Sequence, residues 1–200
     1  MKRRETLDVA RNSLASLMIG LPLCIWNTEF ACAVQSLTWP EFITRLTKLV
    51  SSQFSSDWNQ DSYVDSVCRK IALLDLDGLP LSPIKQGRIE FQSLYKVNSF
   101  EVTQIAFDQG CRIPPHNHPG MTGVLTCLSG KLRVINYELT SEGQLKQVAD
   151  VVLRQSEVSV LTANKHNIHQ VIAVTPCVVM DIFTPPYNTE RERKTKWYGN

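Results

Sequence analysis

Apolar residues recur with two different periods along the chain, and the change of period separates a helical part from a β part. Over residues 36–76 they recur at spacings of three and four, which predicts two or three short amphipathic helices. Thr38, followed by Pro40 and Glu41, predicts a capped start for the first helix. Turn-forming residues over 77–83 end this pattern.

After Gly87 the chain changes to the two-residue alternation and β-branched enrichment of strands, with Gly110, Gly130 and Gly143 in turns. Many short strands at spacings of about ten residues, with no helices between them, indicate an all-β sandwich or barrel and not a parallel α/β sheet. Seven strands are predicted, over residues 100–107, 123–128, 131–139, 148–153, 158–161, 168–174 and 178–183.

The composition is that of an ordinary globular protein. The chain has 200 residues, of which 43% are hydrophobic and 20% charged, which predicts a single domain with a substantial core. The net charge is only +2, so we expect no nucleic-acid partner. The charged tail over residues 190–196 is expected to be solvated.

Residues 1–33 resemble an export leader. A basic start, an uncharged stretch over residues 12–28 and the ending Ala31-Cys32-Ala33 are its three expected parts. Arg3-Arg4 resembles a twin-arginine signal, although Asp8 departs from that motif. The uncharged stretch is too short and too polar to span a membrane, so no integral span is expected. A periplasmic location follows, with an amphipathic N-terminal helix in a cytoplasmic protein as the alternative.

All four histidines fall within residues 116–169. His116 and His118 are two residues apart, so in a strand or at its end both rings can face one point, and antiparallel pairing could bring His169 opposite them. His166 is the competitor for the third place, but its polar neighbours favour the turn before that strand. Three imidazoles without a carboxylate would leave metal positions open, whereas a structural site uses four ligands. From these residues alone, a surface histidine pair stays an alternative.

Two motifs in the right order then point to a known family. Gly110, His116-Asn117-His118-Pro119-Gly120-Met121-Thr122 and Gly130 resemble the first cupin motif, except that Thr122 and Gly123 stand where most cupins have a glutamate ligand. This departure, with the later motif residues, resembles the cysteamine dioxygenase and plant cysteine oxidase family, over roughly residues 70–198. The later motif residues are Asn167-Ile168-His169, Ala173-Val174-Thr175-Pro176-Cys177, Asp181 and Thr184-Pro185-Pro186-Tyr187.

The resemblance implies both a fold and an activity. The fold is a mainly β cupin barrel, a double-stranded β-helix or jelly roll, over residues 86–200, preceded by a helical segment over residues 34–85. The activity is that of a non-haem iron thiol dioxygenase: Fe²⁺ held by His116, His118 and His169 would support addition of both oxygen atoms of O2 to a thiol, giving a sulfinic acid. Asp181 and Tyr187 are implied as catalytic residues.

Other features bear on the substrate and on rival functions. No arginine stands where it would bind an amino-acid carboxylate, so the favoured substrate is a cysteamine-like thiol or a peptide with N-terminal cysteine. Dioxygen is the expected co-substrate. The protein is expected to be a monomer. Cys177 is expected to be a buried small hydrophobic residue, and Cys111 is the cysteine to examine for proximity to iron. The rivals are a cupin isomerase or carbon dioxygenase with another metal, and a non-catalytic cupin that binds metal or senses a ligand.

Overall fold

A computed structural model describes residues 36–53, 60–163 and 167–199. The predicted leader and His166 lie outside the described residues, so the export signal, its twin-arginine character and the role of His166 stay predictions. Within the described part of the chain, no helix is both long and apolar enough to cross a membrane.

Two helices form where the three-and-four spacing predicts them. They are α1, Trp39–Gln53, and α2, Gln60–Ile71. The predicted cap is present, because the Thr38 backbone N–H and hydroxyl both donate to Oε2 of Glu41, at 2.9 and 2.7 Å. A third, short helix that the sequence did not predict, α3, occupies Thr189–Lys194 in the charged tail and buries no side chain.

The described residues form nine strands, two more than predicted. The additional two are β1 and β3. The edge strand β1 has only weak alternation of burial, and β3 contains Pro114 and Pro115, which cannot donate to a β-ladder and so disguise a strand in the sequence. The strands are β1 Ile89–Lys96, β2 Glu101–Phe107, β3 Arg112–Asn117, β4 Thr122–Ser129, β5 Leu132–Leu139, β6 Leu145–Leu153, β7 Val158–Leu161, β8 Ile168–Ala173 and β9 Cys177–Thr184.

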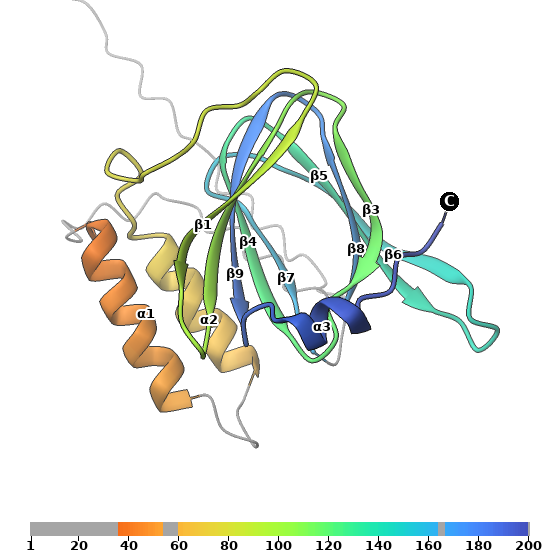
Figure 1. The fold of residues 1–200 in the computed structure, drawn as a ribbon, viewed down its shortest axis with the longest axis horizontal. Coiled ribbons are helices and arrows are strands. Elements are labelled where there is room, and N and C mark those ends of the chain that lie inside the picture. The colour runs from red at the N-terminus through yellow and green to blue at the C-terminus, as the bar shows by residue number, and fades with distance from the viewer. Residues whose placement is uncertain (1–35, 54–59, 164–166, 200) are drawn as a thin grey trace, which may run out of the picture.

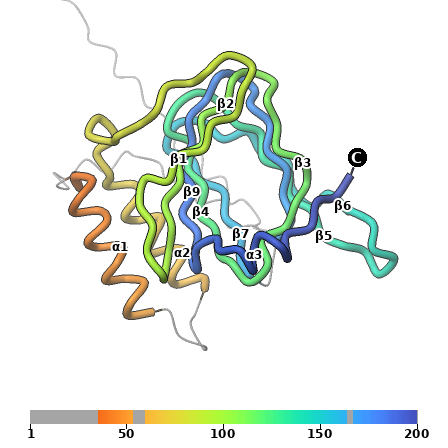
Figure 2. The backbone as a smooth tube through the Cα atoms, viewed as in Figure 1, coloured from red at the N-terminus to blue at the C-terminus, as the bar shows by residue number. Residues whose placement is uncertain are grey.

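The strands build two facing antiparallel sheets (Figure 1). One has the order β1-β2-β9-β4-β7 and the other β3-β8-β5-β6. From β2 to β9 the chain passes back and forth between the sheets, staying in one sheet only for the β5–β6 hairpin, which is a jelly-roll winding. The predicted cupin barrel with N-terminal helices is therefore confirmed. Figure 2 shows α1 and α2 together on the outer side of the five-stranded sheet.

Strand β9 is buried on both faces, and its alternation separates two hydrophobic cores. Val178, Met180 and Ile182 pack with the helices. Cys177 and Val179 point the other way, into the barrel interior. Cys177 is fully buried and burial raises its pKa to about 12, which confirms the prediction of an inert small hydrophobic residue. By the same two-residue period, Asp181 also faces the interior.

Gly130 is required by both conformation and space, and this generates a stability prediction. Its φ is +75°, and an added Cβ would lie 2.1 Å from the Pro176 carbonyl oxygen and 2.7 Å from Cβ of Cys177. We expect Gly130→Ala to lower the free energy of unfolding by more than about 3 kcal/mol, because backbone strain and overpacking add. Urea unfolding followed by circular dichroism measures the change.

Gly143 is the matched control. Its φ is +78°, but nothing lies within 4 Å of an added Cβ, so Gly143→Ala should cost only the strain of about 1 to 2 kcal/mol. Equal losses for the two variants would contradict the steric argument.

Candidate metal centre

Three buried histidines from the four-stranded sheet meet at one point. The register between β3 and β8 places His116 directly opposite His169. His118 follows one residue after the end of β3 and turns its ring to the same side. Their ligand nitrogens lie within 4.8 Å of one another, and Nε2 of His118 is 3.0 Å from Nε2 of His169. The antiparallel pairing expected from the sequence is therefore confirmed.

The hydrogen bonds of the other ring nitrogens set the tautomers. Nδ1 of His116 donates to the Pro114 carbonyl oxygen at 2.8 Å, which leaves Nε2 with a free lone pair. Nδ1 of His118 is hydrogen-bonded to the Tyr187 hydroxyl. When Nε2 of His118 binds a metal ion, its Nδ1 carries the hydrogen and donates to the Tyr187 oxygen. In that tautomer both rings present an unprotonated nitrogen to the same point.

Asn167 and Phe183 hold His118 in place. The Asn167 side chain accepts from the His118 backbone N–H at 2.8 Å and donates to its carbonyl oxygen at 2.7 Å. The ring of Phe183 stacks on His118 with centroids 4.8 Å apart. The sequence places Asn167 in the later motif but does not show which group its side chain binds, and nothing local marks Phe183 as a neighbour of His118.

The cluster suits a divalent metal. Burial lowers the pKa of all three histidines, and that of His118 and His169 falls well below the usual value because these two are the most deeply buried and, to a smaller extent, because the neighbouring imidazoles repel a second charge. The rings are therefore neutral at pH 7, as ligands must be. Two imidazole nitrogens about 2.1 Å from one ion, at a right angle, lie about 3.0 Å apart, which matches the His118–His169 separation.

The histidines line a cavity of about 610 Å³ between the two sheets. Its inner wall is largely apolar, and the described residues that line it include no cysteine and no arginine. Cys111, the candidate for proximity to the metal, packs against the core of the barrel and does not reach the cavity. The apolar residues of the wall are Ile105, Ile113, Leu125, Val171 and Phe183.

Asp181 is a buried acid that lines the same cavity. It sits on β9 between Thr103 of β2 and Leu125 of β4. Its Oδ1 has no hydrogen-bond partner in the described part of the chain. Burial raises the pKa of Asp181 to about 7, against a smaller lowering by the Ile182 backbone N–H. A buried carboxyl group with an unused oxygen facing a cavity is suited to receive a cationic or hydrogen-bonding ligand.

Tyr187 lines the cavity together with its acidic residues and is hydrogen-bonded to His118. Burial, followed by the charges of Asp181, Glu101 and Glu192, raises its pKa above the usual value, so the phenol keeps its hydrogen at neutral pH. Glu101 also lines the cavity and is ion-paired with Lys96, with 2.8 Å between Oε2 and Nζ. The structure thus places both predicted catalytic residues, Asp181 and Tyr187, at the cavity of the three histidines.

The chain is similar to proteins of a known family. The model of the PCO_ADO family matches residues 80–200, more than half of the chain. The chain is 27% identical to 2-aminoethanethiol dioxygenase of Mus musculus over 171 residues, which are 68% of this chain and 66% of that protein. It is 24% identical to plant cysteine oxidase 1 of Arabidopsis thaliana over 120 residues, which are 55% of this chain and 41% of that protein. It therefore spans about two thirds or less of the length of these relatives.

Among solved structures, a conserved protein with a double-stranded β-helix domain from Klebsiella pneumoniae is 13% identical. The match covers 64% of this chain and 91% of the chain of that protein, with a TM-score of 0.47.

Tyr187→Phe tests the orienting contact with His118. Removing the acceptor of the His118 Nδ1 hydrogen should weaken metal binding by about ten- to a hundredfold, because an imidazole ligand depends on the partner of its second nitrogen. Isothermal titration of the metal-free protein with Co²⁺ or Zn²⁺ measures the change.

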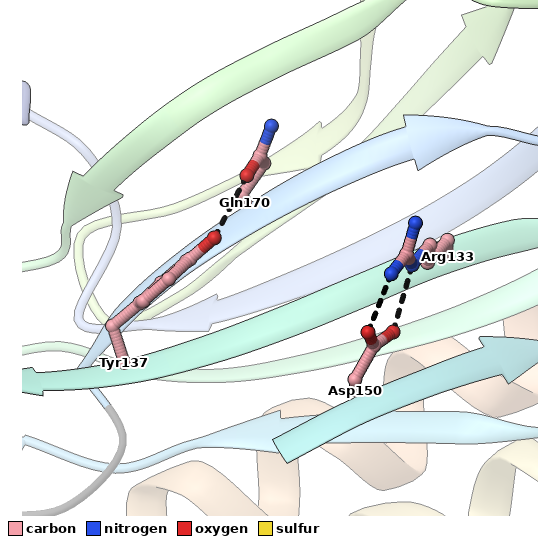
Figure 3. A network of polar contacts seen from close by, with 4 residues as sticks. All are labelled: Arg133, Tyr137, Asp150 and Gln170. Atoms are coloured by element: carbon pink, nitrogen blue, oxygen red, sulfur yellow. Dashed lines mark hydrogen bonds and ion pairs between the residues drawn. The ribbon is translucent and has the colours of Figure 1, made fainter. Parts of the chain in front are cut away.

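Tyr137→Phe is the matched control, because Tyr137 donates to Oε1 of Gln170 at 2.9 Å (Figure 3) and neither residue lines the cavity of the histidines. Its metal affinity should equal that of the wild type. Equal affinities for all three proteins would show that the Tyr187 contact does not support the ligand.

Proposed function

Because this chain belongs to the PCO_ADO family, we propose that it is a non-haem iron thiol dioxygenase that converts a thiol and O2 to a sulfinic acid. The observation that carries the proposal is the cluster of three buried, neutral imidazoles that includes no carboxylate among the described residues. A thiol and one O2 molecule contain every atom of the sulfinic acid, so the reaction requires no further reductant. The names of the two relatives, which concern thiol oxidation, support the same activity.

Iron is the metal that fits this proposal. Three imidazole ligands are compatible with several divalent metals, but they leave open positions that a substrate and dioxygen need. Ferrous iron bound by His116, His118 and His169 would supply the redox chemistry that carries sulfur up two steps of its oxidation ladder. The apolar wall of the cavity keeps bulk water from that chemistry.

Asp181 and Tyr187 supply the polar contacts for the substrate. The unpartnered Oδ1 of Asp181 would accept from an amine on the carbon chain that carries the thiol. The protonated Tyr187 hydroxyl, close to His118, would orient polar atoms at the reacting centre.

The charges of the cavity favour an amine over a carboxylate in the substrate. Lys96 is the one cation among the described lining residues, and Glu101 already neutralises it. A carboxylate of free cysteine would therefore meet acids and no unpaired cation. We propose a thiol next to an amine, either cysteamine or a peptide with N-terminal cysteine, as the substrate.

Oxygen consumption with defined iron content tests the function. The protein is loaded anaerobically with Fe²⁺, its iron is quantified, and oxygen uptake is measured with cysteamine, cysteine and an N-terminal cysteine peptide. We expect oxygen uptake and a mass gain of two oxygen atoms, fastest with the amine-bearing thiols that lack a nearby carboxylate. The absence of oxidation of any thiol by the iron-loaded protein would refute the proposal and favour a non-catalytic binding protein.

Two histidine variants serve as controls for that assay. His169→Ala should lose iron and oxygen uptake together, whereas His166→Ala should keep both, because His169 and not His166 is the expected third ligand. High activity with zinc or manganese, and none with iron, would instead support a cupin enzyme of another class.

Asp181→Asn should raise the free energy of unfolding and lower the catalytic activity. The folded-state pKa of about 7 lies above the ordinary value of 3.8, so the folded state prefers the protonated carboxyl group. The contribution of this group to the free energy of unfolding is therefore fully present below pH 4 and is lost as the pH rises through 7. In metal-free protein the variant should gain, relative to wild type, up to about 4 kcal/mol of unfolding free energy at pH 8 and much less at pH 4. Its kcat/KM should fall by about ten- to a hundredfold through loss of a charged hydrogen bond.

Asp150→Asn is a control with the opposite sign. Asp150 lies on the surface, where the hydrogen bond and charge of Arg133 lower its pKa (Figure 3). Its contribution is present above pH 4 and is lost as pH falls, so this variant should be less stable at pH 8 by under about 1 kcal/mol, with unchanged activity. Thermal unfolding across pH distinguishes the two. A destabilised Asp181→Asn at pH 8 would contradict the assignment.

A further inference from the structure

Trp197 is an exposed aromatic residue held beside a metal-ligand candidate. Its indole stacks on the ring of His116, with centroids 4.8 Å apart and an interplanar angle of 24°. At the same time, 62% of its surface is exposed, and it lines the cavity. One face of the indole therefore covers a histidine while other parts of the ring border the opening.

The backbone around Trp197 is fixed to the edge of β3. The Asn117 N–H donates to the Lys196 carbonyl at 3.1 Å, and the Tyr198 N–H donates to the Pro115 carbonyl at 2.8 Å. The Lys196 N–H also donates to Oδ1 of Asn117 at 2.6 Å. Residues 196–198 thus extend the four-stranded sheet, and both Figures 1 and 2 show the C-terminal end of the chain beside β3. An indole held in this way is a preformed surface.

Phe91 borders the same cavity from the other sheet. It lies on β1, is also 62% exposed, and pairs with Ile105, another residue of the cavity wall. Among the exposed large hydrophobic residues of the described chain, Phe91 and Trp197 are the aromatic ones, and both line this cavity. Exposed apolar surface gathered at one opening indicates a place where a ligand binds.

The charges inside the opening indicate which end of a ligand enters. Asp181, Glu101 and Glu192 line the cavity, and Lys96 is paired with Glu101. Two of the three cations of α3 are engaged elsewhere, because Lys194 pairs with Glu190 and Arg191 donates to a backbone carbonyl, and the third, Arg193, does not line the cavity. An amino group is therefore drawn inward, and the rest of a longer ligand is left at the opening.

We propose that Trp197 and Phe91 form a subsite for the residue that follows the N-terminal cysteine of a peptide substrate. This inference rests on the proposed thiol dioxygenase function. An extended chain advances about 3.5 Å per residue, so a peptide with its thiol at the histidines brings its second residue to an indole 4.8 Å from His116. The cavity of about 610 Å³ is far larger than cysteamine needs, and it lies within the range that holds larger ligands.

Kinetics with a short and a long substrate test the subsite. Trp197→Ala should raise KM for the peptide Cys-Ala-Ala-Ala amide by about tenfold, since the apolar contact between the second residue and the indole is lost, and Phe91→Ala should act in the same direction. The ratio of kcat/KM for the peptide to kcat/KM for cysteamine, measured per bound iron, should therefore fall about tenfold in both variants, because cysteamine does not reach the subsite. Leu139→Ala is the matched control, because Leu139 is 48% exposed at the end of β5 and does not line the cavity.

The comparison separates a subsite from a purely structural role. If Trp197 only supported His116, then Trp197→Ala would lose iron and impair both substrates equally, which would overturn the proposal. Unchanged peptide kinetics in both aromatic variants would also overturn it.

Binding without turnover tests the subsite independently of the activity. Zinc-loaded protein is titrated with Cys-Ala-Ala-Ala amide or with cysteamine while tryptophan emission is recorded. The peptide should shift the emission to shorter wavelength as it covers Trp197, cysteamine should not, and Trp197→Phe should abolish the shift. A shift without oxidation of any thiol would refute the proposed function alone, whereas oxidation of the peptide without a shift would refute the subsite alone.

Discussion

The antiparallel register of β3 and β8 is the constraint on which the site depends, because it places His116 opposite His169. Side chains of a strand alternate between its two faces, so a slip of one residue would turn His169 to the outside of the barrel. Strand β8 pairs with β5 as well as with the edge strand β3, and its apolar side chains that face the barrel interior hold the register. The same interactions that stabilise the barrel therefore hold the histidines together.

Burial gives the site its chemistry and also makes it unfavourable for folding. The low dielectric of the interior keeps the three imidazoles neutral and keeps Asp181 protonated up to about pH 7. An apolar residue at position 181 would match the other interior-facing residues of β9, Cys177 and Val179, which belong to the hydrophobic core of the barrel. An uncompensated buried acid at such a position is typical of a functional site, where stability is sacrificed for binding or catalysis.

Segments outside the eight jelly-roll strands shape the region around the histidines. The Asn167 loop side chain fixes the backbone of His118, and the chain after β9 supplies both Tyr187 and Trp197. Helices α1 and α2 act at a distance, because they cover the outer face of the five-stranded sheet and so bury β9 on both sides. In many proteins a rigid scaffold positions loops and terminal segments that supply functional side chains, and this barrel follows that arrangement.

The sequence by itself determined the helical and β parts of the chain, most of the strands and the three metal-ligand candidates, because periodicity and the i, i+2 spacing of His116 and His118 are local properties. Only the tertiary structure decided which side chains surround them. The pairing of β3, disguised by two prolines, the isolation of Asp181 inside the barrel and the stacking of Trp197 on His116 all join residues far apart in the chain. Such contacts depend on how the sheets close, and no local pattern encodes that.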